Sequence, residues 1–475
     1  MSTNLRIFPF YGRRVIQFNP AAIIDAQKSH FATGTTIRPV DRTRTLAHLK
    51  TTIESNRQKI IDALHEDLGK PPLEGYMSEI AYVLMQIEHD CRNIKKWSKK
   101  KKVSTPLVNQ PGKSWYAPRP FGCTLIIGPW NYPFGLIFSP VVSSLAAGNC
   151  AILKPSEYAP ATASCIEAMI AQSFNPGLLT VITGGPEETK QLIANNPDFI
   201  FFTGGGRTGK AVMEAASRTL TPVALELGGK NPCIVDAGVP VKETAKRIAW
   251  GKFLNAGQTC VSPDFLCAHE SVFDSLQKTL IETIKDFYGD DPRTSPDFGR
   301  IINPRHAHRL ADLLKDTKPS FGGAADPDNR FIAPAIVPFD NWDIPLMDEE
   351  VFGPILPITS YSGLDTLLAR LRALPAPLAL YCFTSDSAVK KNVLQESRSG
   401  TVCFNGTAHA IVSSELPFGG IGDSGIGRYH GKAGFDTFSY IRSVMDKHHG
   451  LGFSQMYPPY TKSVDFISKI RKFLL

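Results

Sequence analysis

Apolar residues recur at helical spacing over residues 41–102, in two series separated by a break. The break is GKPP at residues 69–72, and a glycine followed by prolines is typical of the end of a helix. The two series are Leu46, Leu49, Ile53, Ile60, Ile61, Leu64 and Leu68, and then Ile80, Val83, Leu84, Ile87 and Ile94. Lysines between residues 95 and 102 predict a solvated helix end, with contact to acidic lipid or nucleic acid as the alternative.

From residue 122 the pattern changes to short apolar runs that alternate with helical segments. The predicted strands are 123–127, 151–153, 179–182, 199–202 and 223–225, and the predicted helices are 134–148, 160–173, 187–194 and 207–217. This alternation is typical of parallel βαβ units, so the predicted fold class is α/β. Such sheets bind ligands at the carboxyl ends of their strands, so the residues directly after each strand are the functional candidates.

A second α/β stretch follows from residue 231. Its predicted elements are a strand at 233–235, helices at 241–254 and 271–287, and strands near 264–269, 331–337 and 379–384. Residues 319–330 are expected to form an exposed loop. Residues 460–475 predict a small basic amphipathic helix that is too short to span a bilayer.

The composition is that of a soluble globular protein. With 475 residues, 43% apolar and 20% charged, two or three domains are expected, and disordered, collagenous and coiled-coil classes are excluded. The net charge of +8 is too small for a dedicated nucleic-acid binder, so we expect no nucleic-acid partner. The nine cysteines show no zinc spacing, so we expect reduced thiols and no metal. Without a signal peptide or a long apolar span, a soluble cytoplasmic protein is expected.

Polar residues follow two of the predicted strands at positions that suit catalysis and cofactor binding. Asn131 follows the strand 123–127 and lies between two prolines, and its carboxamide can donate to a developing oxyanion. Lys154 and Glu157 follow the strand 151–153 and can hold the hydroxyls of a cofactor ribose. An ordinary turn and a surface ion pair are the respective alternatives.

Three further post-strand segments carry candidate chemistry. Residues 203–210, TGGGRTGK, open a helix, where glycines and free N–H groups can bind a pyrophosphate; a mere helix start is the alternative. Glu226 leaves a buried strand and can act as a general base with a raised pKa. Cys260 follows the turn NAGQT and can act as a nucleophile, with an inert buried thiol as the alternative.

Taken in order, these motifs resemble the aldehyde dehydrogenase superfamily. The set is PWN, KPSE, the Gly-rich FTG loop, LELGGK, GQTC and EEVFGP at residues 349–354, with the Glu-to-Cys spacing of that superfamily. The resemblance covers roughly residues 40–445. Residues 416–438, with LPFGGIG, RYHGK and FDTF, are similar to the class 3 group, which handles fatty and aromatic aldehydes.

The resemblance implies a role for individual residues. Cys260 would be the nucleophile, Asn131 and the Cys260 backbone N–H the oxyanion hole, and Glu226 the general base. The implied cofactor contacts are Trp130, Lys154, Glu157, Gly204, Gly209, Glu350 and Phe352. The implied reaction is NAD(P)-dependent oxidation of an aldehyde to the acid, through a cysteine thiohemiacetal, hydride transfer to the nicotinamide and a thioester. Glu157 would repel a 2′-phosphate, which favours NAD over NADP.

The resemblance also implies a domain plan and partners. The expected parts are a Rossmann-like cofactor domain (residues 30–105 and 126–228), an α/β catalytic domain (229–424), a bridging segment (106–125 and 425–446) and a tail (447–475). The expected partners are an aldehyde substrate and a second subunit in a homodimer. For the C-terminal tail, packing on the protein body or on the dimer partner is favoured, with peripheral contact to a membrane surface as the alternative. An acylating aldehyde dehydrogenase and a non-catalytic scaffold are the alternative functions.

Two positions depart from the pattern of that superfamily. Gly206 stands where many relatives have threonine in the Gly-rich turn, and this turn bears on how the cofactor is held. Gly406 stands where the class 3 group usually has an acidic residue, in a region expected to shape the substrate mouth.

Overall fold

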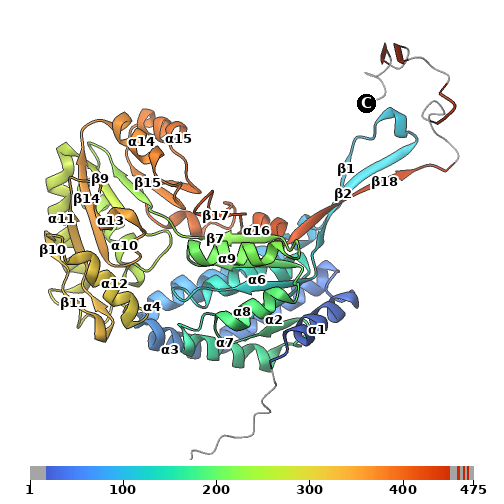
Figure 1. The fold of residues 1–475 in the computed structure, drawn as a ribbon, viewed down its shortest axis with the longest axis horizontal. Coiled ribbons are helices and arrows are strands. Elements are labelled where there is room, and N and C mark those ends of the chain that lie inside the picture. The colour runs from blue at the N-terminus through green and yellow to red at the C-terminus, as the bar shows by residue number, and fades with distance from the viewer. Residues whose placement is uncertain (1–17, 450–456, 461–463, 466–467, 470–475) are drawn as a thin grey trace, which may run out of the picture.

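The computed structural model describes residues 18–449, 457–460, 464–465 and 468–469. Figure 1 shows two lobes, each built around a β-sheet with helices against it, and a three-stranded arm that projects from the body. The mixed α/β architecture confirms the fold class predicted from the alternating pattern. The predicted C-terminal amphipathic helix lies largely outside the described residues.

The first lobe contains a six-stranded sheet in the order β17-β7-β6-β3-β4-β5. Five strands are parallel, and β17 pairs antiparallel with β7. In chain order the parallel strands are arranged 5-4-1-2-3, which is the Rossmann arrangement. The strands are β3 (Cys123–Ile127), β4 (Cys150–Lys154), β5 (Leu179–Val181), β6 (Phe199–Thr203), β7 (Val223–Glu226) and β17 (Gly425–Ile426).

Helices cover both faces of this sheet. The apolar residues of α6 and α7 pack in one core on one face, and those of α1, α8 and α9 pack in another core on the other face. The helices are α1 (Pro20–Ala32), α6 (Gly135–Ala147), α7 (Pro160–Ser173), α8 (Pro186–Ala194) and α9 (Gly206–Ser217). Helix α6 is largely apolar and almost wholly buried, because it lies between the sheet and the N-terminal helices.

The N-terminal helices follow the predicted periodicity closely. They are α2 (Pro39–Ser55), α3 (Arg57–Leu68), α4 (Pro72–Gly75), the π-helical turn η1 (Tyr76–Ala81) and α5 (Tyr82–Trp97). Gly69 ends α3 in the left-handed conformation, with a φ of 59°. One expectation was wrong: α5 ends at Trp97, and the last lysines of the basic run lie in an exposed strand, β1 (Lys101–Val103), that pairs with β2.

The second lobe contains a seven-stranded sheet in the order β10-β13-β14-β9-β8-β15-β16. Its strands are β8 (Pro232–Val235), β9 (Phe265–His269), β10 (Phe321–Gly322), β13 (Ala335–Pro338), β14 (Ile355–Tyr361), β15 (Ala379–Phe383) and β16 (Thr401–Phe404). Helices α10 and α11 pack on one face, and α14 and α15 on the other. These helices are α10 (Val241–Phe253), α11 (Glu270–Tyr288), α14 (Leu364–Ala373) and α15 (Ser387–Glu396).

Short elements complete this lobe. They are η3 (Leu254–Gly257), α12 (Pro304–Leu314), β11 (Ala325–Asp326), η4 (Pro327–Asn329), β12 (Phe331–Ile332), α13 (Pro345–Asp348) and η5 (His409–Val412). Helix α16 (Gly431–Thr437) instead packs on α5 and α6 of the first lobe. The segment 319–330 is not the plain loop expected, because it contains β10, β11 and η4. The predicted strand 331–337 is split into β12 and β13, with proline at position 334 between them.

The projecting arm is a three-stranded antiparallel sheet in the order β1-β2-β18. Strand β2 (Gly112–Pro120) pairs along its whole length with β18 (Ser439–Lys447), and η2 (Leu107–Asn109) precedes β2. The division of the chain into domains stays a prediction. Within the described ranges, no helix is both long enough and apolar enough to cross a bilayer.

Candidate active site

Cys260 follows an unusual turn at the end of α10. Asn255, Ala256 and Gly257 all have left-handed φ angles, of 53°, 50° and 73°. Only glycine adopts this conformation at no steric cost, so the surrounding contacts must hold the two other residues in it. The Cys260 thiol is half-buried, and burial together with the Glu350 and Glu226 carboxylates raises its pKa to about 12. The thiol therefore keeps its proton at neutral pH until a base removes it.

Asn131 is buried directly beside this turn. Its side-chain Nδ2 donates to the main-chain carbonyl of Gln258 at 2.9 Å, and its main-chain carbonyl accepts from Nδ2 of Asn255 at 2.8 Å. Next to it, the hydroxyls of Tyr132 and Thr259 hydrogen-bond at 2.7 Å. Two segments that are far apart in sequence, the one after β3 and the one before Cys260, are thus joined by buried hydrogen bonds.

Glu226 is the last residue of β7 and is buried. In the described part of the chain, neither of its carboxyl oxygens has a hydrogen-bond partner. Burial raises the pKa of Glu226 well above its usual value, and the nearby Arg428 opposes this only in part. The carboxyl is close enough to Cys260 to raise the pKa of the thiol, and once ionised a group of such high proton affinity is able to take a proton from water.

Glu350 and Phe352 lie on the segment before β14. A Cβ on Gly228 would overlap the Glu350 carboxylate, so this carboxylate packs directly against the turn after Glu226. Burial and the Asp264 carboxylate raise the pKa of Glu350 to about 8. The Phe352 ring meets Trp130 edge-on, with ring centroids 5.3 Å apart. The structure therefore brings these three predicted cofactor residues to the site of Cys260 and Glu226.

Lys154 ends β4 and is buried. Its Nζ donates to the carbonyl of Gly184 at 2.6 Å and to that of Pro155 at 3.1 Å. Burial lowers the pKa of Lys154, while the Glu157 and Glu188 carboxylates oppose that change. Glu157 itself is exposed. These residues therefore lie at the carboxyl edge of the six-stranded sheet.

Gly204 lies in the turn from β6 into α9, and Gly209 lies in the first turns of α9 itself. A Cβ on Gly204 would come within 2.6 Å of the Phe202 ring, and one on Gly209 within 2.6 Å of Leu227, so a side chain at either position would force its neighbour to move. A Cβ on Gly205 or Gly206 would meet nothing within 4 Å. The first turn of α9 is therefore open, and its N–H groups can bind an anionic group such as a pyrophosphate.

Two further residues hold the Glu350 segment and were not singled out from the sequence. Lys230 forms a close ion pair with Asp264 and donates to the carbonyls of Leu346 at 2.7 Å and Glu349 at 2.9 Å. The Asp264 carboxylate accepts from the N–H of Val351 at 2.9 Å. Lys230 closes the LGGK motif and could have been found there, whereas no pattern marks Asp264.

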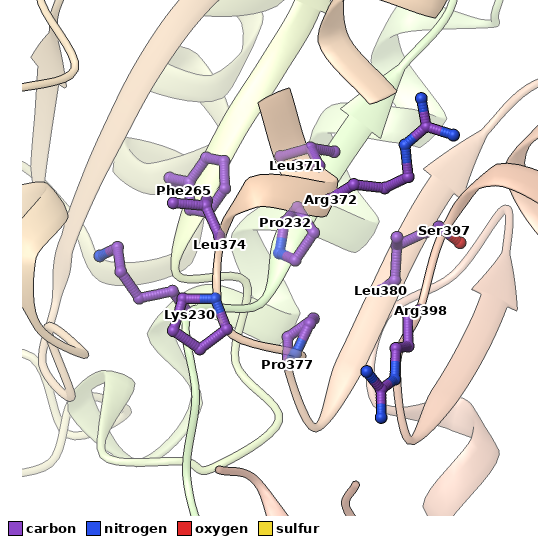
Figure 2. Close-up of a pocket in the computed structure, with 11 residues that line it drawn as sticks. Lys230, Pro232, Phe265, Leu371, Arg372, Leu374, Pro377, Leu380, Ser397 and Arg398 are labelled. Carbon is purple, nitrogen blue, oxygen red and sulfur yellow. The ribbon is translucent and has the colours of Figure 1, made fainter. Parts of the chain in front are cut away.

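Figure 2 shows a pocket on the second lobe, and Lys230 is one of the residues that line it. Its lining consists of Lys230, Pro232, Phe265, Leu371, Arg372, Leu374, Pro375, Pro377, Leu380, Ser397 and Arg398. None of these is a predicted catalytic or cofactor residue. The pocket therefore does not mark the candidate active site, although Lys230 connects the two regions.

Known proteins resemble this chain over nearly its whole length. The 4,4'-diaponeurosporen-aldehyde dehydrogenase of Staphylococcus aureus (strain NCTC 8325 / PS 47) is 43% identical over 447 residues, which cover 94% of this chain and 97% of that protein. Aldehyde dehydrogenase family 3 member B1 of Rattus norvegicus is 43% identical, over 91% of this chain and 92% of that protein.

A solved structure shows the same similarity in three dimensions. The structure described as "Substrate bound state of Staphylococcus Aureus AldH" superposes with a TM-score of 0.91 at 42% identity, covering 95% of this chain and 99% of that one. Residues 19–444 match the Aldehyde dehydrogenase family, beginning before the first motif seen in the sequence. The resemblance, including that to the class 3 group, is confirmed: this chain belongs to the aldehyde dehydrogenase family.

Proposed function

We propose that this NAD(P)-dependent aldehyde dehydrogenase works through Cys260 as nucleophile, Asn131 as oxyanion donor and Glu226 as general base. One observation supports this most strongly. The Asn131 carboxamide is hydrogen-bonded to the turn that carries Cys260, while the Glu226 and Glu350 carboxylates are close enough to raise the pKa of the thiol. A nucleophile, an oxyanion donor and a base thus meet in one buried place.

The proposed steps follow from the state of each group. The Cys260 thiol releases its proton to water and its sulfur attacks the carbonyl carbon of the aldehyde, while Asn131 Nδ2 and the Cys260 N–H bind the oxyanion. The oxyanion collapses as hydride leaves the carbon, and a thioester remains on Cys260. Ionised Glu226 then takes a proton from water, which attacks the thioester, and the carboxylic acid leaves as the thiol re-forms.

The residues at the sheet edge fit a dinucleotide cofactor. The open first turn of α9 suits a pyrophosphate, and Lys154 with Glu157 lies where an adenosine ribose would be bound in a Rossmann arrangement. Glu350 and Phe352 would hold the nicotinamide half beside Cys260. When bound, NAD or NADP supplies the acceptor for the hydride. We infer a preference for NAD, because the exposed Glu157 carboxylate would repel a 2′-phosphate.

We further propose a long, apolar aldehyde as substrate. Cys260 lies near the phenol rings of Tyr82, Tyr132 and Tyr429, and burial is the main cause that raises the pKa of all three hydroxyls. A site of this kind excludes water and favours a hydrocarbon chain over a polar one. The Staphylococcus aureus relative is named for the aldehyde 4,4'-diaponeurosporen-aldehyde.

An absorbance assay tests the proposed activity. NADH formation should rise with aliphatic aldehydes of graded chain length, without coenzyme A, and kcat/KM should increase from short to long chains. A requirement for coenzyme A would indicate an acylating enzyme instead. Absence of turnover with every aldehyde of the series would indicate a non-catalytic scaffold.

We propose a homodimer formed through the projecting arm. Strand β18 is the edge of the arm sheet, and Tyr440, Ile441 and Met445 on it expose 38%, 54% and 46% of their surface. An exposed apolar edge strand is a typical pairing surface. Light scattering should give the mass of two chains, and Ile441→Lys should shift it to one.

We propose that the protein is cytoplasmic and contacts anionic membranes reversibly through its basic C-terminal tail. The sequence places Lys462, Lys469, Arg471 and Lys472 there, and each basic residue near an anionic surface contributes about 1 kcal/mol. Full-length protein should pellet with anionic liposomes at low salt and be released at high salt. Equal behaviour of a chain ending at Pro459 would contradict a membrane role for the tail.

A further inference from the structure

Three charged residues gather beneath the active site without belonging to it. Lys70, Glu74 and Glu79 come from the short stretch that joins α3 to α5. The Lys70 and Glu79 side chains are fully buried and form a close ion pair. Glu79 lies in the π-helical turn η1, and such turns are frequent at functional sites.

The Lys70–Glu79 pair holds the segment that carries Asn131. The second carboxyl oxygen of Glu79 accepts from the N–H groups of Phe134 at 2.9 Å and Gly135 at 3.0 Å, where α6 begins. Lys70 Nζ donates to the carbonyl of Asn131 at 3.2 Å. The same ammonium lies 4.2 Å from the centre of the Tyr132 ring. The pair therefore fixes the main chain at the proposed oxyanion donor and directly after it.

Glu74 holds the other half of the site. Its carboxylate accepts from the N–H of Asn255 at 3.0 Å, the first of the left-handed residues before Cys260. The Asn255 side chain in turn donates to the carbonyl of Asn131 at 2.8 Å and to that of Gln258 at 3.2 Å. The Asn131 carbonyl thus accepts from Lys70 on one side and from Asn255 on the other.

We infer that Lys70, Glu74 and Glu79 are positioning residues that hold the Asn131 turn and the Cys260 turn at a fixed position relative to each other. Stability alone is a weak reason for such a pair, because apolar residues of similar volume often replace a buried ion pair without loss. The relative position of the two turns matters far more to catalysis, since a shift of about 1 Å between reacting groups can lower the rate by about 100-fold. The inference rests on the proposed roles of Asn131 and Cys260.

Two sets of variants test it. Glu74→Ala removes the acceptor for the Asn255 N–H, whereas Glu74→Gln keeps an acceptor oxygen. Lys70→Met/Glu79→Met removes the ion pair without leaving a lone buried charge. Lys50→Met/Glu88→Gln is the matched control, because Lys50 and Glu88 form an exposed ion pair at 2.7 Å in the same helical region.

We expect Glu74→Ala and the double variant to lower kcat by about tenfold or more, while KM for the aldehyde and the Kd for NAD change less than about threefold. Glu74→Gln should restore most of kcat, and the control should match the wild type. If kcat stays within about twofold in both test variants, the inference is wrong. It is also wrong if kcat falls only together with NAD affinity and thermal stability, because that pattern marks general unfolding.

A variant of Cys260 separates this inference from the proposed function. If Cys260→Ala keeps its activity, the proposed function itself fails. If Cys260→Ala is inactive while Glu74→Ala and the double variant turn over normally, only the positioning role fails. If the double variant does not fold, Glu74→Ala and its rescue by Glu74→Gln still test the positioning role.

Discussion

The two halves of the site differ in how far the chain encloses them. Around Cys260, the side chains of Asn131, Asn255 and Gln258 are buried and bonded to main-chain groups of the two facing turns. Along the cofactor edge, Glu157 is exposed and the turn at Gly205 faces open space. The protein therefore holds the groups around Cys260 in place by itself, whereas the cofactor edge keeps open surface that a bound ligand would cover.

The largest effect is expected at Cys260. Because the nucleophile cannot be replaced by a neighbouring group, Cys260→Ala should lower kcat by about 10⁴-fold or more, while NAD still binds at the other half. Steady-state NADH formation and calorimetric NAD binding measure the two effects. Cys165→Ser is the control, because Cys165 is also half-buried but lies on α7. A rate above a few per cent of wild type for Cys260→Ala would remove Cys260 from the mechanism.

The second-largest loss of kcat is expected for substitution of Asn131. Loss of one preorganised oxyanion donor costs about 10²- to 10³-fold in kcat, and Asn131→Ala removes the donor itself. The NAD Kd should stay close to wild type, because Asn131 bonds to the Cys260 turn and not to the cofactor edge. A loss of NAD affinity as large as the loss of kcat would erase the proposed separation between the two halves.

Substitution of Glu226 should slow one step only, the hydrolysis of the thioester. The pKa of Glu226 is raised by burial, and only the ionised form accepts a proton, so thioester hydrolysis should accelerate as the pH rises. Glu226→Gln should give a burst of NADH followed by slow turnover, and the slow phase should lose this rise. Stopped-flow absorbance across the pH range measures both phases. Disappearance of the burst would place Glu226 in an earlier step, such as activation of Cys260.

The smallest effect is expected at the open half. Glu157→Gln removes the charge that opposes a 2′-phosphate, so the ratio of kcat/KM for NADP to that for NAD should rise several-fold, with little change in kcat. Glu187→Gln, on α8 and equally outside the core, should leave the ratio unchanged. An unchanged ratio in both variants would show that Glu157 does not face the ribose.

Sequence periodicity was sufficient to predict the elements of the first lobe from β3 to β7, but it predicted neither α1 nor β17. The predicted helix 160–173 coincides with α7, and the strand 123–127 with β3, because short apolar runs and amphipathic segments are local properties. The order of the motifs also indicated the family. Local patterns do not carry the contacts that join segments far apart, since these depend on the order of strands in the sheet.

Lys70 and Asp264 illustrate that limit. In the sequence Lys70 only belongs to a helix stop, and its contact with Asn131 spans 61 positions. Asp264 lies near the start of a strand, and its contact with Val351 spans 87 positions. The π-helical turn that carries Glu79 likewise has no periodic signature, because it is a single local widening of an otherwise regular helix.

Direct detection of the covalent intermediate tests the central claim most directly. Glu226→Gln, mixed with NAD and a long-chain aldehyde and quenched in acid within the burst, should gain the mass of one acyl group per chain. Proteolysis should place this group on the peptide that contains Cys260. Unmodified Cys260 after a full burst of NADH, or an acyl group on another cysteine, would contradict the proposed mechanism.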